Sequence, residues 1–133
     1  LTDRIPAYRL SIGARLPRIG GLAATWRGPL TSALPRSGLV VDLRSQGYAA
    51  AWRPPEGTLV RVRAFTEHDG RRTVVSHMAK ATRGDVARLL VKARATPRDP
   101  EGVAALVGRA GHRVELTGPD RDGSWSVDVI RTA

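Results

Sequence analysis

The chain has 133 residues, a net charge of +10, a pI near 11.5 and no cysteine. This length suits one domain with a core of ordinary size, and we expect a single domain over residues 1–133. The absence of cysteine excludes disulfides, a thiolate nucleophile and a cysteine-ligated metal. Because excess positive charge attracts polyanions, nucleic acid is the leading class of partner. A genome rich in G and C that encodes arginine freely would raise the pI in the same way.

The sequence has no apolar run near the roughly 18 residues that a membrane span needs, and no signal segment. We therefore expect a cytoplasmic, soluble protein that does not bind membranes. The chain begins at Leu1 rather than at a methionine, which suggests a cut within a longer polypeptide. Residues 1–53 hold eight Lys or Arg against only Asp3 and Asp42, so a basic face is expected there.

The first elements are short. Residues 5–11 predict an extended segment, and residues 22–34 predict a helix that breaks near Gly28–Pro29, with Trp26 on its apolar side. Consecutive apolar residues over 38–45 are typical of a strand that is buried on both faces.

Ser45 ends that strand and is a fair N-cap for a short helix over 46–52. Residues 58–78 then alternate as a hairpin, with Asp69–Gly70 in the turn and Val74–Val75 on the return strand. The junction at Ser45, between the strand over 38–45 and the helix over 46–52, is a position where α/β sheets often collect ligands.

After Lys80 the apolar period changes to about 3.6 residues, which predicts a helix that ends before Pro97. A second helix follows over residues 100–110. Residues 112–132 predict another hairpin, with a turn over 119–123 and one apolar side made by Trp125, Val127 and Val129. The expected fold class is α/β (mixed α+β), with a mixed, largely antiparallel sheet and flanking helices.

The stretch "SHMAKATRG" suggests an anion site. Thr82 and Asp85 have the spacing of a capping box, which would place Lys80 just before a helix and Arg83 in its first turn. Cations there oppose the helix dipole. A phosphate bound by Lys80, Arg83 and free backbone N–H groups would reverse that penalty.

Gly84 would let such a ligand approach the backbone, and Arg88 would extend the site along the helix. The alternative is that Lys80 and Arg83 are solvated or pair with Asp85. His77 could line the same cleft as a hydrogen-bond donor or general base, or be structural.

Asp42 could accept a hydrogen bond from a base or sugar, or hold Arg44 or Arg9 in place. Tyr48 could stack on a base or fill the core. In "AYRLS", extended backbone would put Tyr8 and Leu10 on one face and Arg9 and Ser11 on the other. Arg9 would then meet a phosphate or form a salt bridge.

No pair of histidines has metal-ligand spacing, and the sequence lacks a P-loop, a nucleophile elbow and a full dinucleotide fingerprint. We therefore expect no metal and no cofactor, and a binding protein is favoured over an enzyme.

Three strings in this order, "IPAYRLSIG", "LVVDLRSQGYAA" and "SHMAKATRGDVARLLV", resemble the YaaA family of bacterial peroxide-stress proteins. The match spans almost the whole chain but only the C-terminal half of a family member, so the N-terminal half is expected to be absent. The recurring family motifs fall on Tyr8 to Ser11, on Asp42 to Ser45 with Tyr48, and on Lys80, Arg83 and Gly84.

The resemblance implies a partial YaaA-type fold, a positively charged cleft, DNA binding, and a cytoplasmic role in limiting damage from hydrogen peroxide and unincorporated iron. It also implies that the remaining half exposes an apolar surface, which the missing N-terminal half or a second copy would cover.

The first hypothesis is a protein that binds duplex or branched DNA, with phosphates contacted by Arg9, Arg44, Lys80, Arg83 and Arg88. The residues expected to line the same cleft are Tyr8, Ser11, Asp42, Ser45, Tyr48, His77 and Gly84. The alternatives are an enzyme that holds a nucleotide-like small molecule, with His77 or Asp42 as acid or base, and a remnant without activity.

Overall fold

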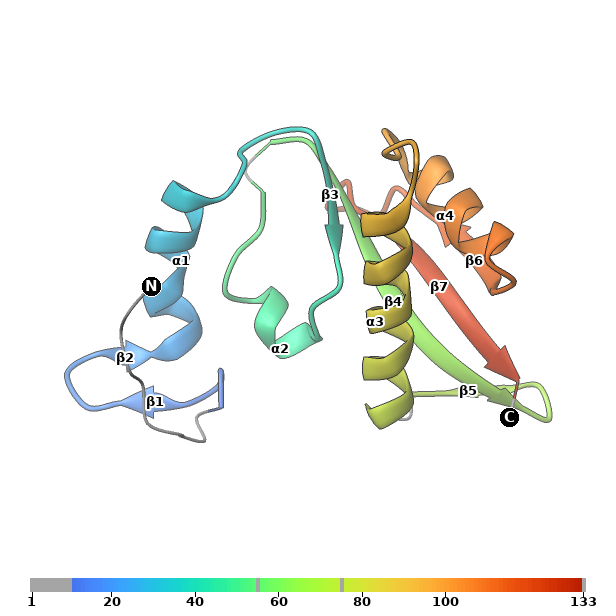
Figure 1. The fold of residues 1–133 in the computed structure, drawn as a ribbon. Helices are drawn as coiled ribbons and strands as arrows, with labels where there is room; N and C mark the ends of the chain where they lie inside the picture. The colour runs from blue at the N-terminus through green and yellow to red at the C-terminus, as the bar shows by residue number, and fades with distance from the viewer. Residues whose placement is uncertain (1–10, 55, 75, 133) are drawn as a thin grey trace.

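The computed structural model describes residues 11–54, 56–74 and 76–132. Figure 1 shows the elements in chain order. Their bounds are β1 Arg15–Leu16, β2 Gly20–Gly21, α1 Leu22–Ala33, β3 Leu39–Asp42, α2 Gln46–Ala49, β4 Thr58–His68, β5 Arg71–Thr73, α3 Ser76–Lys92, α4 Pro100–Arg109, β6 Arg113–Thr117 and β7 Trp125–Thr132.

A mixed sheet has the strand order β3-β4-β7-β6, and β5 pairs with the end of β4. The β4–β5 and β6–β7 hairpins are antiparallel, as predicted, and Asp69–Gly70 forms the turn of the first. The mixed α/β class is therefore confirmed. The central pairings, of β4 with β3 and with β7, are parallel. The sheet is therefore mixed, as predicted, but the expectation that it is largely antiparallel is wrong, because these long-range pairings of β4 are parallel.

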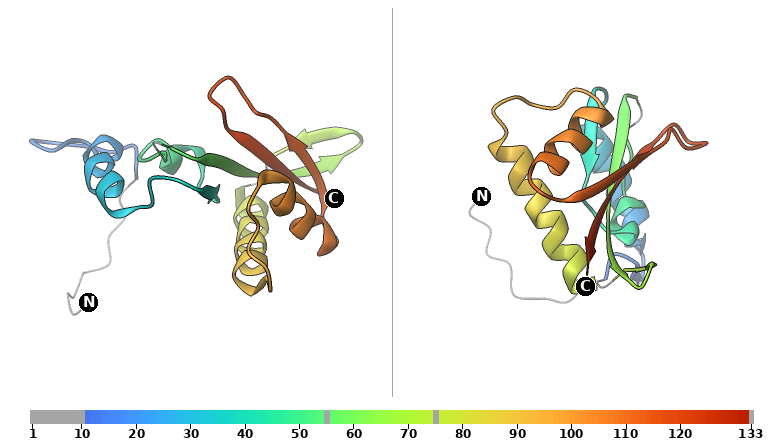
Figure 2. Two further views of the ribbon diagram at one scale, coloured as in Figure 1. Left: turned by 90° about the horizontal axis from the view of Figure 1, so that it is seen from above. Right: turned by 90° about the vertical axis from the view of Figure 1, so that its right-hand side faces the viewer.

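Helices α3 and α4 cover one face of this sheet (Figure 2). Alternation along β4 turns Val60 and Val62 toward them, and the register sets Val62 opposite Val127 of β7,. The buried core consists of Val60, Val62, Val86, Val103, Val107, Val127 and Val129. The predicted apolar side of the second hairpin therefore faces the core, with Trp125 packed against it.

The opposite face of the sheet carries arginines paired with carboxylates. The pairs are Arg63 with Asp128, Arg72 with Glu67 and Glu115, and Arg113 with Glu67 and Glu115. Hydrogen bonds from Arg113 and Arg72 lower the pKa of Glu67 below its ordinary value. Each exposed pair adds little stability by itself, but together they neutralise much of the charge on this face.

The prediction that residues 38–45 form a strand buried on both faces is wrong. β3 covers only Leu39–Asp42, and Leu39, Val40 and Val41 are half-buried. The reason is its position, since within residues 11–54, 56–74 and 76–132 β3 pairs only with β4 and forms an edge of the sheet. The strand-to-helix junction itself is confirmed, with Ser45 directly before α2, although the Ser45 hydroxyl makes no capping hydrogen bond. The helix ends at Ala49 rather than at residue 52, where the sequence predicted its end.

The predicted break near Gly28–Pro29 is also wrong, because α1 continues through Pro29. Pro29 is exposed, and the missing N–H removes one intrahelical hydrogen bond without ending the helix. Trp26 is 49% exposed, since α1 lies apart from the sheet beyond β3 (Figures 1 and 2).

The return strand of the first hairpin ends earlier than predicted. β5 stops at Thr73, and Val74 is exposed outside the strand, while Val75 lies outside the described residues. α4 agrees closely with its prediction, and its N-cap Asp99 accepts a hydrogen bond of 2.7 Å from the Gly102 N–H. No helix in the described ranges is long and apolar enough to cross a membrane.

Candidate functional site

The segment Leu43 to Ser45, between β3 and α2, separates two concave surfaces. On one side is a cavity of about 380 Å³ between this segment and α3, which we call the basic groove. Its lining residues are Leu43, Ser45, Lys80, Arg83, Gly84 and Ala87. On the other side is a mainly apolar cavity of about 510 Å³ between the segment and α1, which we call the apolar groove.

Helical periodicity explains how α3 contributes to the basic groove. Lys80, Gly84 and Ala87 recur at spacings of four and three residues and share one side of the helix. Arg83 is half-buried beside them, and its Nε donates to the Ala79 carbonyl at 3.1 Å. Neither Lys80 nor Arg83 pairs with a carboxylate of the described residues. Two cations therefore face the groove without a local counter-charge.

The prediction that Thr82 caps this helix is wrong. α3 already begins at Ser76, and Thr82 is only 1% exposed, within the helix and against the core. Lys80 and Arg83 consequently lie inside the helix, where backbone N–H groups are used by the helix itself. The helix-terminus part of the predicted anion site is lost, and only the side chains remain.

Asp85, the other half of the predicted capping box, points elsewhere. Its Oδ2 accepts a hydrogen bond of 2.8 Å from Nη2 of Arg131 in β7. Asp85 therefore does not neutralise Lys80 or Arg83. Gly84 has open space where a side chain would begin, so a ligand in the basic groove can approach the helix backbone there.

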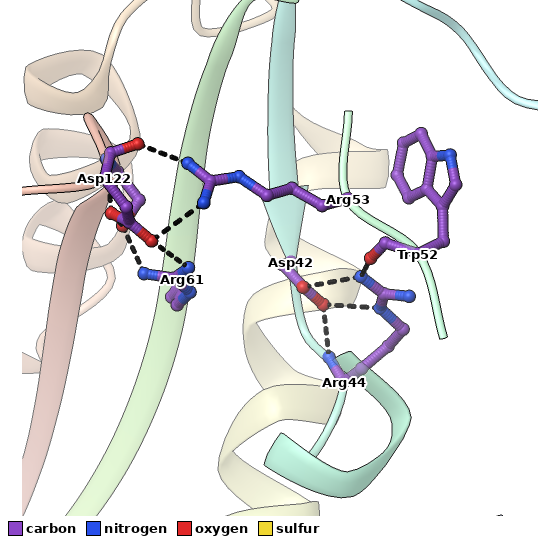
Figure 3. Close-up of polar contacts among 7 residues, drawn as sticks. Asp42, Arg44, Trp52, Arg53, Arg61 and Asp122 are labelled. Carbon is purple, nitrogen blue, oxygen red and sulfur yellow. Dashed lines mark hydrogen bonds and ion pairs between the residues drawn. The ribbon is translucent and has the colours of Figure 1, made fainter. Parts of the chain in front are cut away.

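Asp42 and Arg44 hold the separating segment in place (Figure 3). Arg44 donates from Nε to Asp42 Oδ1 and from Nη2 to Asp42 Oδ2, both at 2.8 Å. It also donates to the carbonyls of Trp52 at 2.7 Å and Tyr48 at 3.3 Å. The pairing of Asp42 with Arg44, one of the two roles considered for Asp42, is thus observed.

This pairing sets the charge state of Asp42. Burial alone would raise the pKa of the carboxyl group, but the hydrogen bonds and positive charge of Arg44, with a smaller attraction from Arg61, lower its pKa below the ordinary value. Asp42 is therefore ionised at neutral pH and is suited to anchoring rather than to acid catalysis. Four of the five Arg44 N–H groups are occupied,, which leaves one for an outside ligand.

A second cluster, which the sequence patterns did not indicate, lies near Asp42 in Figure 3. Asp122 in the β6–β7 turn accepts hydrogen bonds from Arg61 at 2.8 Å and from Arg53 at 3.0 Å, and Arg61 also bonds Ser124. The contacts from Arg61 and Ser124 lower the pKa of Asp122. The feature of the sequence that could have indicated this cluster is the Asp-x-Ser spacing of Asp122 and Ser124. It is typical of a turn in which the Ser N–H donates to the Asp side chain, and here Ser124 N–H donates to Asp122 Oδ1 at 3.0 Å,.

The remaining predicted residues are spread over the molecule. Asp42, Arg44 and Tyr48 line the apolar groove rather than the basic one. His77 and Arg88 are exposed on α3 but do not line the basic groove. Ser11 is exposed and its hydroxyl accepts from the Gly13 N–H at 3.3 Å.

Tyr8 and Arg9 lie outside the described residues. Among the residues that are described, no group of three or more His, Asp or Glu side chains could hold a metal ion. Of the predicted residues, the structure therefore brings Ser45, Lys80, Arg83 and Gly84 together in the basic groove, beside the ion pair of Asp42 with Arg44.

Comparison with known proteins identifies the family. A sequence model of the family described as peroxide stress protein YaaA matches residues 1–115. The chain is 42% identical over 135 residues to a UPF0246 protein of Streptomyces coelicolor, covering 98% of this chain and 52% of that protein. The chain therefore belongs to the YaaA family, as the resemblance predicted.

Other relatives agree. A UPF0246 protein of Corynebacterium glutamicum is 40% identical over 119 residues, covering 86% of this chain and 48% of that protein. One from Ruegeria sp. is 32% identical over 132 residues, covering 90% and 52%. The chain thus spans about half the length of the curated relatives that it matches.

Proposed function

We propose that this chain supplies a phosphate-binding surface to a DNA-binding peroxide-stress protein, and that the basic groove is that surface. The observation that carries the proposal is the grouping of Lys80 and Arg83 with Ser45 and Gly84 in one groove, with no carboxylate among its lining residues. Two cations and a hydroxyl can bind the oxygens of a phosphodiester, and the open space at Gly84 lets the phosphate come close to the helix,.

The charge distribution along α3 supports the proposal. This helix carries the cations Lys80, Arg83, Arg88 and Lys92, and within the described part of the chain none of them forms an ion pair. Its one acidic residue is Asp85, which Arg131 engages. By contrast, the arginines on the open face of the sheet are paired with carboxylates. The excess positive charge is therefore available along α3, where a polyanion would lie.

Family membership supports the biological part of the proposal. The protein would act in the cytoplasm during peroxide stress and limit oxidative damage linked to unincorporated iron. Because the chain spans about half of its relatives, we propose that it provides one part of the complete binding surface. Arg44 then positions the groove wall at Ser45, rather than contributing most of the phosphate contacts.

The salt dependence of DNA binding tests this proposal. We would titrate labelled duplex and four-way-junction DNA with the chain between 50 and 200 mM salt. The Lys80→Ala/Arg83→Ala variant is expected to bind more weakly. Its slope of log K against log salt should be smaller by about two, since each lost phosphate contact removes roughly 0.9 from the slope.

Arg109→Ala/Arg121→Ala is the matched control. It removes the same charge from two exposed positions, at the end of α4 and in the β6–β7 turn, and should leave the slope nearly unchanged. Equal losses in both double variants would mean that only bulk charge matters. Affinity that does not change between 50 and 200 mM salt would contradict the proposal outright.

A second candidate is a site for a nucleotide-like small molecule. The volume of the basic groove, about 380 Å³, lies within the range of cavities that hold small ligands. Saturable binding of a mononucleotide that Lys80→Ala abolishes, while DNA binding persists, would favour this candidate.

A further inference from the structure

The apolar groove has the composition of an interior surface, although it is open. Helix α1 contributes Trp26 and Leu30, and Leu34 follows as its C-cap. The facing wall is formed by Val40 and its neighbours in and after β3. The groove has two charged lining residues, Asp42 and Arg44, and they bind each other. The charges of these two lining residues therefore neutralise each other.

Helix α1 lacks the packing that stabilises helices of its length. It has 12 residues, and none of them is buried. An isolated helix this short is marginal in water, and most helices gain stability by burying an apolar side. Here that side is open, with Trp26 49% and Leu34 37% exposed, and across the groove Tyr48 is 51% exposed. A cluster of large apolar side chains of this kind marks an interaction surface.

Two polar features of the groove also lack partners. The indole Nε1 of Trp52 is buried and finds no hydrogen-bond acceptor in the part of the chain that the structure describes. Among the described residues β3 is an edge strand, hydrogen-bonded only to β4, and α2 lies between β3 and α1 in Figure 1. An edge strand presents unpaired N–H and C=O groups that another strand can satisfy.

The curated relatives contain about as much additional polypeptide as this chain provides, since the chain covers 52% and 48% of two of them. We propose that the apolar groove is the docking site for the other half of the family polypeptide. That half inserts an apolar segment into this groove, whose walls come from α1, β3 and the residues around α2. The segment covers Trp26, Leu34 and Tyr48, which are exposed in this chain,.

A second copy of this chain is a poorer occupant. Each copy carries a net charge of +10, so self-association brings two strongly positive molecules together. Docking of the other half has a further consequence, because the apolar and basic grooves share the segment Leu43 to Ser45. An occupant on one side of this segment supports the position of Ser45 on the other.

The test uses the 133-residue chain and, as a separate polypeptide, the residues of the Streptomyces coelicolor relative outside the matched region. The two are mixed, and also co-expressed with an affinity tag on the second polypeptide only. Light scattering after size exclusion measures the mass of the complex. We expect a 1:1 complex from at least one of the two routes.

Fluorine NMR of the chain labelled with 5-fluorotryptophan locates the contact, since its three tryptophans report on different places. Trp26 and Trp52 line the apolar groove, and Trp125 packs against the valine core. Complex formation should shift the resonances of Trp26 and Trp52 and leave that of Trp125 almost unchanged.

Leu34→Asp should weaken the complex at least tenfold, because it places a charge in the groove. The control is Val91→Asp, at a position 87% exposed on α3 and outside the groove, which should leave the Kd unchanged. The proposal is overturned if neither route gives a complex, or if both variants bind equally well. It is also overturned if the chain alone is a dimer that Leu34→Asp dissociates, since a second copy would then occupy the groove.

Discussion

Arg44 holds Asp42, the last residue of β3, through two hydrogen bonds of 2.8 Å and reaches across to the Trp52 carbonyl at 2.7 Å. One side chain thereby ties the end of an edge strand to the segment that follows α2. Because Arg44 belongs to the segment Leu43 to Ser45, which contributes to both grooves, this contact fixes their relative positions.

Arg44→Ala should lower the free energy of unfolding by about 1 to 3 kcal/mol, because it leaves the buried carboxylate of Asp42 without its main partner. The stability of Arg44→Lys should lie between those of the unmodified chain and Arg44→Ala, since an ammonium group cannot reproduce the planar two-bond contact. Urea unfolding followed by circular dichroism measures both. Arg36→Ala, at an exposed position, is the control. If it costs as much as Arg44→Ala, the ion pair is not the cause.

The pairing also predicts how stability depends on pH. The folded pKa of Asp42 is lowered by Arg44, so its contribution is present above the ordinary pKa near 4 and is lost as pH falls through the folded value. Without Arg44, burial would raise this pKa instead, and protonation would then relieve the cost. The stability gap between the unmodified chain and Arg44→Ala should therefore shrink from pH 6 to pH 3. A stability gap that is constant from pH 6 to pH 3 would contradict the conclusion that Arg44 lowers the pKa of Asp42.

Replacing Thr82 tests whether it caps the start of a helix, as the sequence predicts, or is buried within α3, as the structure has it. As an N-cap, Thr82 would tolerate replacement by Asn, which is a better cap. As a core residue that is 1% exposed, it should not, because the Asn side chain is larger and buries an amide. We expect Thr82→Asn to cost roughly 1 to 3 kcal/mol in urea unfolding. Ala81→Asn, on the exposed side of the same helix, should cost about 0.5 kcal/mol from helix propensity alone.

Gly84 allows stability and binding to be separated. It lies inside α3 with open space at the Cβ position, so Gly84→Ala should stabilise the helix by about 0.5 to 1 kcal/mol. The added methyl group enters the basic groove, and DNA affinity should fall even though stability rises. Gly108→Ala in α4 also meets no atom within 4 Å and should leave affinity unchanged. An equal change in DNA affinity for the two variants would argue against ligand contact at Gly84.

Sequence patterns were sufficient where the determining interactions are local. The two hairpins, the short helix after Ser45 and the helix capped by Asp99 depend on turn residues, caps and alternation over a few neighbours. The family, too, was evident from three short strings. The same reasoning misplaced the start of α3, because a capping-box spacing at Thr82 also fits a residue inside a helix. Only the observed bounds of α3 and the burial of Thr82 show which applies.

The sequence by itself determined the strand and helix types, the excess of positive charge and the candidate cations Lys80 and Arg83. Only the tertiary structure decided that β3 is an edge strand, that Arg44 is engaged by Asp42, and that Ser45 lies beside Lys80 and Arg83. The edge position of β3 and the approach of Ser45 to α3 depend on parallel pairing and on contacts between residues far apart in the chain. The pair of Asp42 with Arg44 is local, and the structure decided between the roles that the sequence left open. Periodicity describes which side of an element is apolar, but not which other element it meets.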